Sequence, residues 1–204
     1  MTATAIVTTA GASETTNGAH LARLRELTGA IDARTRALMG DLQPDELLWR
    51  PAPDRWGIAD CFEHLVATGL AYYPRVGDAM SAARPVSAAD RQAWADEPYR
   101  ATWFGRWFVR SAGPGGRPIR TRGPFVPPPA TPDAPERFLA QQCTLRGLIA
   151  RAAEGHDLRA IRIHSPLGRL LTLRLGECLE MLVAHELRHL EQAERVMTGV
   201  GGRR

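Results

Sequence analysis

The chain has 204 residues, of which 44% are hydrophobic and 24% charged, which is ordinary for a soluble globular protein and sufficient for one domain with a sizeable core. The formal net charge of +4 comes from arginines scattered along the chain, so the sequence lacks the basic stripe that nucleic acid binding needs. Because no run of about 18 apolar residues occurs and the three cysteines show no paired spacing, we expect a cytoplasmic protein without a membrane span or disulfides.

Four segments place apolar residues at helical spacing, and we expect helices over residues 19–40, 58–83, 133–154 and 172–198. Asp133 and Thr172 are the expected N-caps of the last two helices. The sequence shows no convincing strand. Residues 1–18 and 199–204 are expected to be flexible tails, which leaves 19–198 as a single helical domain.

The connection between the second and third helices, residues 84–131, is rich in proline and glycine and contains a short expected helix over 99–110. So long a connection is unusual in a compact domain unless it crosses the bundle or covers a site. Trp94, Trp103 and Trp107 could line a pocket, although packing against the open side of the bundle is favoured. The pattern predicts an all-α four-helix bundle with a long crossover between helices 2 and 3.

The sharpest local signal is His185-Glu186-Leu187-Arg188-His189 in the last helix. Residues four apart lie on the same helix face, so both imidazoles can reach one metal ion. The third ligand is predicted to be His64, which lies beside the apolar stripe of the second helix. Three imidazoles leave a coordination position open, as in catalytic sites. Taken alone, the pair could arise by chance and His64 could be a hydrogen-bonded core residue.

The same five residues match the H-E-x-x-H pattern of zinc proteases, in which Glu186 would be the general base. Only 15 residues follow His189, and Gln192 stands where the longer motif has glycine, so a metalloprotease is the weaker alternative. Glu186 could equally be a solvated residue or a partner of a ligand. Cys61 and Cys178 lie near the histidines on their helices and are interpreted as small buried apolar residues rather than ligands.

Several segments together carry a family resemblance. They are Trp56-Gly57-Ile58-Ala59-Asp60 with Glu63-His64-Leu65, Trp103-Phe104-Gly105-Arg106, Phe125-Val126-Pro127, Ser165-Pro166-Leu167-Gly168, Leu171-Thr172-Leu173, and His185 through Gln192. In order and spacing they resemble the DinB/YfiT-like family of metal-dependent four-helix-bundle proteins. One departure is Ser165, which stands where the family often has a histidine before the proline.

The resemblance implies up-down-down-up topology, a frequent homodimer, and a triad of His64, His185 and His189 that binds zinc, nickel or a similar divalent ion. It also implies thiol chemistry, because some members are thiol-dependent transferases. We therefore expect a metal-dependent enzyme acting on a small-molecule substrate, either an S-transferase that uses a low-molecular-weight thiol or a related hydrolase. The alternative is a non-enzymatic, metal-binding, stress-associated bundle protein.

Overall fold

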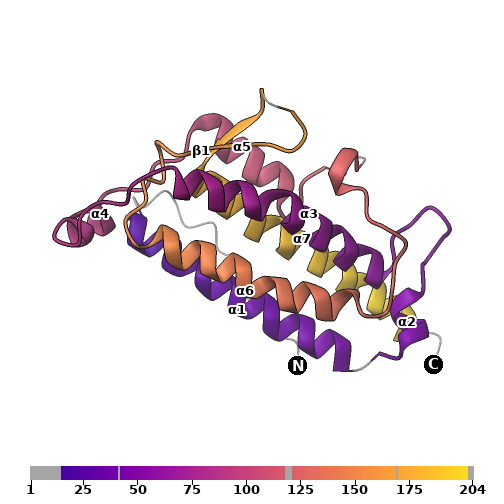
Figure 1. The fold of residues 1–204 in the computed structure, drawn as a ribbon. Helices are drawn as coiled ribbons and strands as arrows, with labels where there is room; N and C mark the ends of the chain where they lie inside the picture. The colour runs from indigo at the N-terminus through magenta and orange to yellow at the C-terminus, as the bar shows by residue number, and fades with distance from the viewer. Residues whose placement is uncertain (1–14, 41, 118–120, 169, 202–204) are drawn as a thin grey trace.

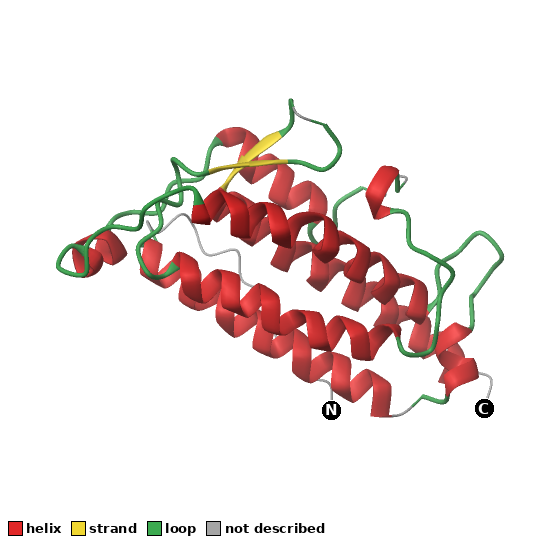
Figure 2. Cartoon of the chain, in the orientation of Figure 1, coloured by secondary structure: helices red, strands yellow, loops and turns green. Residues whose placement is uncertain are grey.

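The structure is a computed structural model that describes residues 15–40, 42–117, 121–168 and 170–201. Four long helices dominate it: α1 (Asn17–Gly40), α3 (Ile58–Ser81), α6 (Ala134–Ala152) and α7 (Leu175–Gly201). The chain runs in one direction in α1 and α7 and in the opposite direction in α3 and α6 (Figure 1). The all-α fold predicted from the sequence is confirmed, since the described part contains only two very short strands (Figure 2).

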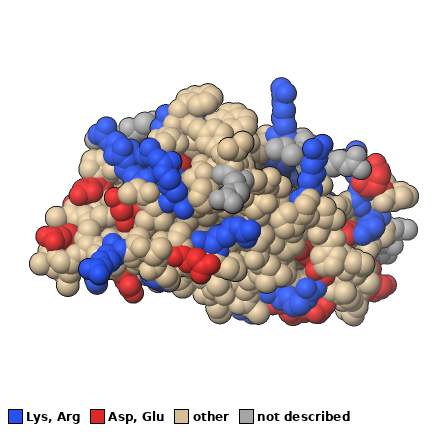
Figure 3. All heavy atoms as spheres, turned by 45° about the horizontal axis from the view of Figure 1, so that its top comes forward, with Lys and Arg blue, Asp and Glu red and all other residues tan. Residues whose placement is uncertain are grey.

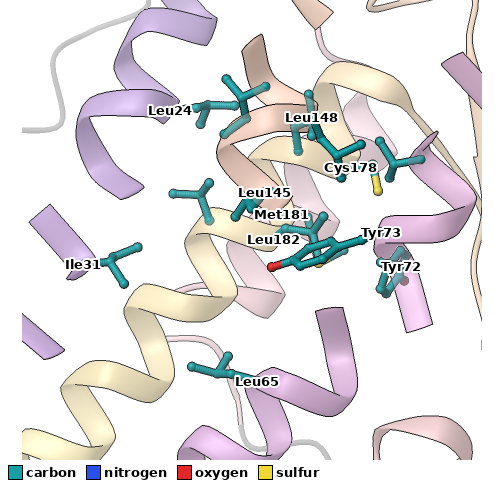
Figure 4. Packing of buried hydrophobic residues seen from close by; sticks show 14 of the residues in the cluster. Leu24, Ile31, Leu65, Tyr72, Tyr73, Leu145, Leu148, Cys178, Met181 and Leu182 are labelled. Carbon is teal, nitrogen blue, oxygen red and sulfur yellow. The ribbon is translucent and has the colours of Figure 1, made fainter. Parts of the chain in front are cut away.

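The core lies between the four helices, where α1 and α3 each pack against both α6 and α7. Helix α3 is buried along most of its length because the crossover covers the face that the other helices leave open. Its Phe62 packs on Phe138 of α6 with 5.4 Å between ring centroids. Burial of one such side chain stabilises the fold by about 2–3 kcal/mol. Tyr73 lies between the ribbons of α3 and α7, among buried leucines (Figure 4).

The crossover is more ordered than the sequence indicates. Besides α5 (Trp103–Ala112), which replaces the helix expected over 99–110, it contains α4 (Arg91–Asp96) and the short 3-10 helix η1 (Gly123–Phe125). Another short helix, α2 (Pro44–Leu48), precedes α3. Because α5 packs on α7 and η1 packs on α3, the crossover closes the side of the bundle where these two helices meet.

Two of the three crossover tryptophans do not pack as expected. Trp94 is buried, but Trp103 and Trp107 are 73% and 52% exposed. These two residues are four apart and share the outer face of α5, whereas Phe104 and Phe108 contact the core. The expectation that all three cover the bundle was therefore wrong for Trp103 and Trp107.

A β-hairpin precedes α7 and corrects the expectation that the chain has no strand. Strand β1 (Arg162–His164) pairs antiparallel with β2 (Thr172–Arg174), and their central residues are both buried. Three-residue strands are too short for the two-residue alternation to be seen in the sequence. Thr172 lies in β2 and is not the N-cap of α7, because the helix begins at Leu175.

A buried glutamate takes over the capping role at this helix start. One carboxylate oxygen of Glu177 accepts a hydrogen bond from the Arg174 backbone N–H at 3.0 Å. The other accepts from both the backbone N–H and the hydroxyl of Thr102, each at 2.6 Å. The Thr102 hydroxyl in turn caps α5 by accepting from Gly105 N. One side chain therefore ties the first turn of α7 to the first turn of α5, which fixes the crossover on the bundle.

The expected tails fall mostly outside the described residues, namely 1–14 and 202–204. The described part of the first belongs to the fold, since Asn17 begins α1 and its side chain donates to Trp94 O at 3.0 Å. Helix α7 likewise extends past its expected end, and Val200 is buried. Among the described helices we find none with the length and apolar run that crossing a bilayer requires.

Candidate metal centre

The structure brings together the three histidines predicted as ligands. His64 comes from α3, and His185 and His189 lie one turn apart on α7. Their candidate ligand nitrogens all lie within 4.8 Å of one another. The ring centroids are 4.5–5.0 Å apart, with the rings roughly perpendicular. The three imidazoles therefore form a cluster of the size that one metal ion could occupy.

The Nδ1 atom of each ring lies within hydrogen-bond distance of a backbone or side-chain amide oxygen. His64 Nδ1 lies 2.8 Å from Phe125 O, and His185 Nδ1 lies 3.3 Å from Ala112 O. His189 Nδ1 lies 3.2 Å from the side-chain oxygen of Gln192. An oxygen of this kind only accepts, so each Nδ1 carries the proton and donates it. The neutral rings then keep a lone pair on Nε2, which is the form that binds metal ions.

The Nε2 atoms of the cluster are arranged to bind a metal ion rather than to hydrogen-bond to one another. His64 Nε2 and His185 Nε2 are only 2.9 Å apart. With both protons on Nδ1, two lone pairs face each other at this distance and repel. A cation accepted by both nitrogens removes the repulsion, so the donor set suits a divalent metal.

Burial keeps the rings in the metal-binding form. His64 and His189 are buried, and His185 is partly exposed. Desolvation is the main cause that lowers the pKa of His64 and His189, and it lowers the pKa of His185 to about 3. The positive charge of Arg188 lowers the pKa of all three further. At neutral pH the three imidazoles are therefore uncharged, and no proton competes with a metal.

A cavity of about 610 Å³ opens beside the cluster, and all three histidines line it. Its aromatic wall comes from the segment before α3, from α3 itself and from the crossover: Trp56, Tyr72, Phe108 and Phe125. Tyr72 Oη lies within hydrogen-bond distance of Ser165 Oγ, at 3.1 Å. Ser165, which stands where the resembled family often has a histidine, therefore holds Tyr72 in this wall. The cluster therefore faces a space large enough for a small-molecule substrate.

Several groups that contact the histidines were not predicted from the sequence. The carbonyls of Ala112 and Phe125 come from the crossover, and backbone groups leave no mark in a sequence. Trp56 stands 5.0 Å from the His64 ring and 5.6 Å from the His189 ring, centroid to centroid. Gln192 could have been found, because it follows His189 by three residues and so lies on the same helix face.

Glu186 does not line the cavity beside the histidines. It is 4% exposed and points into the bundle interior, where its carboxyl accepts a hydrogen bond from Tyr73 Oη at 3.2 Å. Burial raises the pKa of Glu186 to about 8, so the group is protonated at neutral pH. A general base for metal-bound water needs a carboxylate in the cavity, so this geometry favours a structural role for Glu186.

Two further cysteines and two further histidines do not belong to the cluster. Cys61 and Cys178 are fully buried, and desolvation raises the pKa of both thiols, as expected of small core residues. His20 stacks on Tyr99 with 3.7 Å between ring centroids. The ring of His156 meets the Arg151 carbonyl at 2.9 Å.

Replacing Gln192 with alanine should weaken metal binding by about tenfold, because partners of metal-bound histidines contribute about 10–100-fold to affinity. Gln192→Glu should restore or strengthen binding, since a charged acceptor makes the imidazole more basic. Titration calorimetry with zinc measures both effects. Gln92→Ala on the exposed face of α4 is the control, and an unchanged affinity in Gln192→Ala would show that His189 needs no such partner.

Comparison with known proteins gives one result. A family model of the DinB superfamily matches residues 27–193, a stretch that contains all three clustered histidines. No curated protein and no solved structure is similar enough to the chain to count as a match.

Proposed function

The chain belongs to the DinB superfamily, and on this premise we propose that it is a metal-dependent thiol S-transferase that holds one divalent ion with His64, His185 and His189. The observation that carries the proposal is a cluster of three neutral imidazoles that opens onto a cavity. A structural metal site would instead fill all coordination positions with protein side chains.

The charge of the site supports a thiol as the substrate. A divalent ion bound here would lower the pKa of a thiol or water ligand and make it nucleophilic at neutral pH. The three histidines contribute no negative charge, and Arg188 adds a positive one nearby. An anionic ligand such as a thiolate is therefore electrostatically favoured at the open position.

The cavity walls would position the second substrate, an electrophile. Trp56, Phe108 and Phe125 give the cavity an apolar lining that excludes water from the reacting atoms. Desolvation raises the pKa of Tyr72 to about 12, so its hydroxyl keeps its proton and can donate a hydrogen bond to the electrophile. Without a thiol the same site could activate water, which makes hydrolysis a close variant.

The rest of the proposal follows the family resemblance. Zinc or nickel is the proposed ion, because imidazole suits both metals and the donor set does not choose between them. A cytoplasmic location and a homodimer remain predictions.

The decisive experiment combines the metal-loaded protein with a low-molecular-weight thiol and a bromobimane as electrophile. In the expected reaction a sulfur–carbon bond forms, bromide leaves and the thiol proton passes to buffer. Chelation should abolish the rate enhancement, and returning zinc or nickel should restore it. If the protein binds metal but accelerates neither alkylation of the thiol nor hydrolysis of an ester, the non-enzymatic metal-binding alternative replaces this proposal.

A further inference from the structure

A second cavity adjoins the one beside the histidines. Its volume is about 660 Å³, and it lies between the segment before α3, the glycine-rich turn after α5 and the last turns of α7. The two cavities share four lining residues, which we call the partition: Arg55, Trp56, Arg188 and Gln192. The two cavities are therefore neighbours that meet at these four residues.

The partition is in direct contact with the histidine cluster. Trp56 lies 5.0 Å from the His64 ring and 5.6 Å from the His189 ring, centroid to centroid. The Gln192 side chain lies 3.2 Å from His189 Nδ1. Trp56 and Gln192 therefore contact the histidine cluster and also line the second cavity.

The lining of the second cavity has a positive charge. Arg55, Arg188 and Arg195 contribute three guanidinium groups, and Glu191 contributes the single carboxylate. Arg188 is held in place, because its side chain donates to Ser111 O at 3.0 Å and to Arg117 O at 3.2 Å. Arg195 is exposed and belongs to the second cavity alone. Guanidinium groups arranged around a cavity favour carboxylates and phosphates as ligands.

We propose that the substrate thiol is an elongated molecule that places its sulfur at the histidine cluster and an anionic group, such as a carboxylate, in the second cavity. This inference rests on the proposed function and adds the chemical class of its thiol. Arg195 binds the anionic end, and Trp56 contacts the linking chain between the two ends. A short thiol, or a neutral one, makes only the first of these contacts.

Matched thiols separate the effects of length and charge. The probes are mercaptopropionate and mercaptohexanoate, each paired with the alcohol of the same length, mercaptopropanol and mercaptohexanol. Binding is measured on cobalt-loaded protein from the sulfur-to-cobalt absorption band. We expect the hexanoate to bind about tenfold more tightly than its alcohol, as for one charge-assisted contact to an arginine. Any preference for the short acid over its alcohol comes from chelation of the cobalt by its carboxylate and does not depend on Arg195.

A single arginine variant tests whether the anionic end of the thiol binds at Arg195 in the second cavity. Arg195→Gln should remove the preference for the hexanoate and leave binding of both alcohols unchanged. Arg36→Gln, an exposed substitution on α1 with the same change in charge, should keep the preference. A hexanoate preference that survives in Arg195→Gln, or equal binding of acid and alcohol in the wild type, overturns the inference.

The outcomes also separate this inference from the proposed function. Failure to bind cobalt, or the absence of any sulfur-to-cobalt band with all four probes, contradicts the metal and thiol chemistry of the first cavity. If every probe gives the sulfur-to-cobalt band but the hexanoate and its alcohol bind equally tightly, only the role of the second cavity is contradicted.

Discussion

Replacing His185 with alanine should lower the affinity for zinc or nickel by more than about 100-fold. Loss of an outer partner of a metal-bound histidine costs about 10–100-fold, and loss of a ligand itself must cost more. His64 and His189 would remain as candidate donors, and this three-residue cluster contains no carboxylate that could replace the lost nitrogen. Titration calorimetry on metal-free protein gives the affinity directly.

The same variant should lose the stabilisation that metal gives to the wild type. At a free metal concentration of 100 times the dissociation constant, binding to the folded state adds about 2.7 kcal/mol to the free energy of unfolding. His156→Ala is the control, since it also removes a buried histidine but one that lies outside the cluster. Metal affinity that is unchanged in His185→Ala and in His64→Ala would refute the metal centre.

Replacing Glu186 with glutamine should stabilise the metal-free protein at neutral and alkaline pH. The carboxyl is buried against Tyr73, and Gln142 and the ion pair of Asp32 and Arg146 lie near it. Because burial raises the pKa of Glu186 from its ordinary value of 4.5 to about 8, the folded state holds this proton more tightly than the unfolded state does. Its contribution to stability is complete below pH 4.5 and is lost as pH rises to about 8.

Glutamine has the shape of the protonated acid and does not titrate. The stability difference between Glu186→Gln and the wild type should therefore be small below pH 4.5 and grow to about 5 kcal/mol above pH 8. Urea unfolding with a chelator present, at acidic, neutral and alkaline pH, measures this difference. Glu154→Gln, an exposed substitution, should show no such trend.

The Glu186→Gln variant also tests the protease alternative. Any turnover by the metal-loaded protein should stay near the wild-type value, because Glu186 faces the bundle interior and not the cavity. A general base for metal-bound water would instead be indispensable, so its replacement by an amide would abolish hydrolysis. Loss of turnover with an unchanged pH dependence of stability would restore the H-E-x-x-H interpretation.

The sequence by itself determined the parts of this protein that depend on local periodicity. Apolar spacing predicted all four long helices to within three residues at each end, and the spacing of His185 and His189 placed both rings on one face of α7. These features follow from the helical repeat, which acts between residues close together in the chain.

Only the tertiary structure decided what depends on contacts between distant segments. His64 was chosen from the sequence as the third ligand, but its closeness to His185 requires α3 to pack on α7. The carbonyls of Phe125 and Ala112 reach the rings because the crossover closes over these helices. Glu186 is buried in the bundle interior, where it contacts Tyr73 of α3. The H-E-x-x-H motif alone does not reveal this contact, because Tyr73 is distant in the sequence. Periodicity fixes which residues share a helix face, and long-range packing fixes what that face meets.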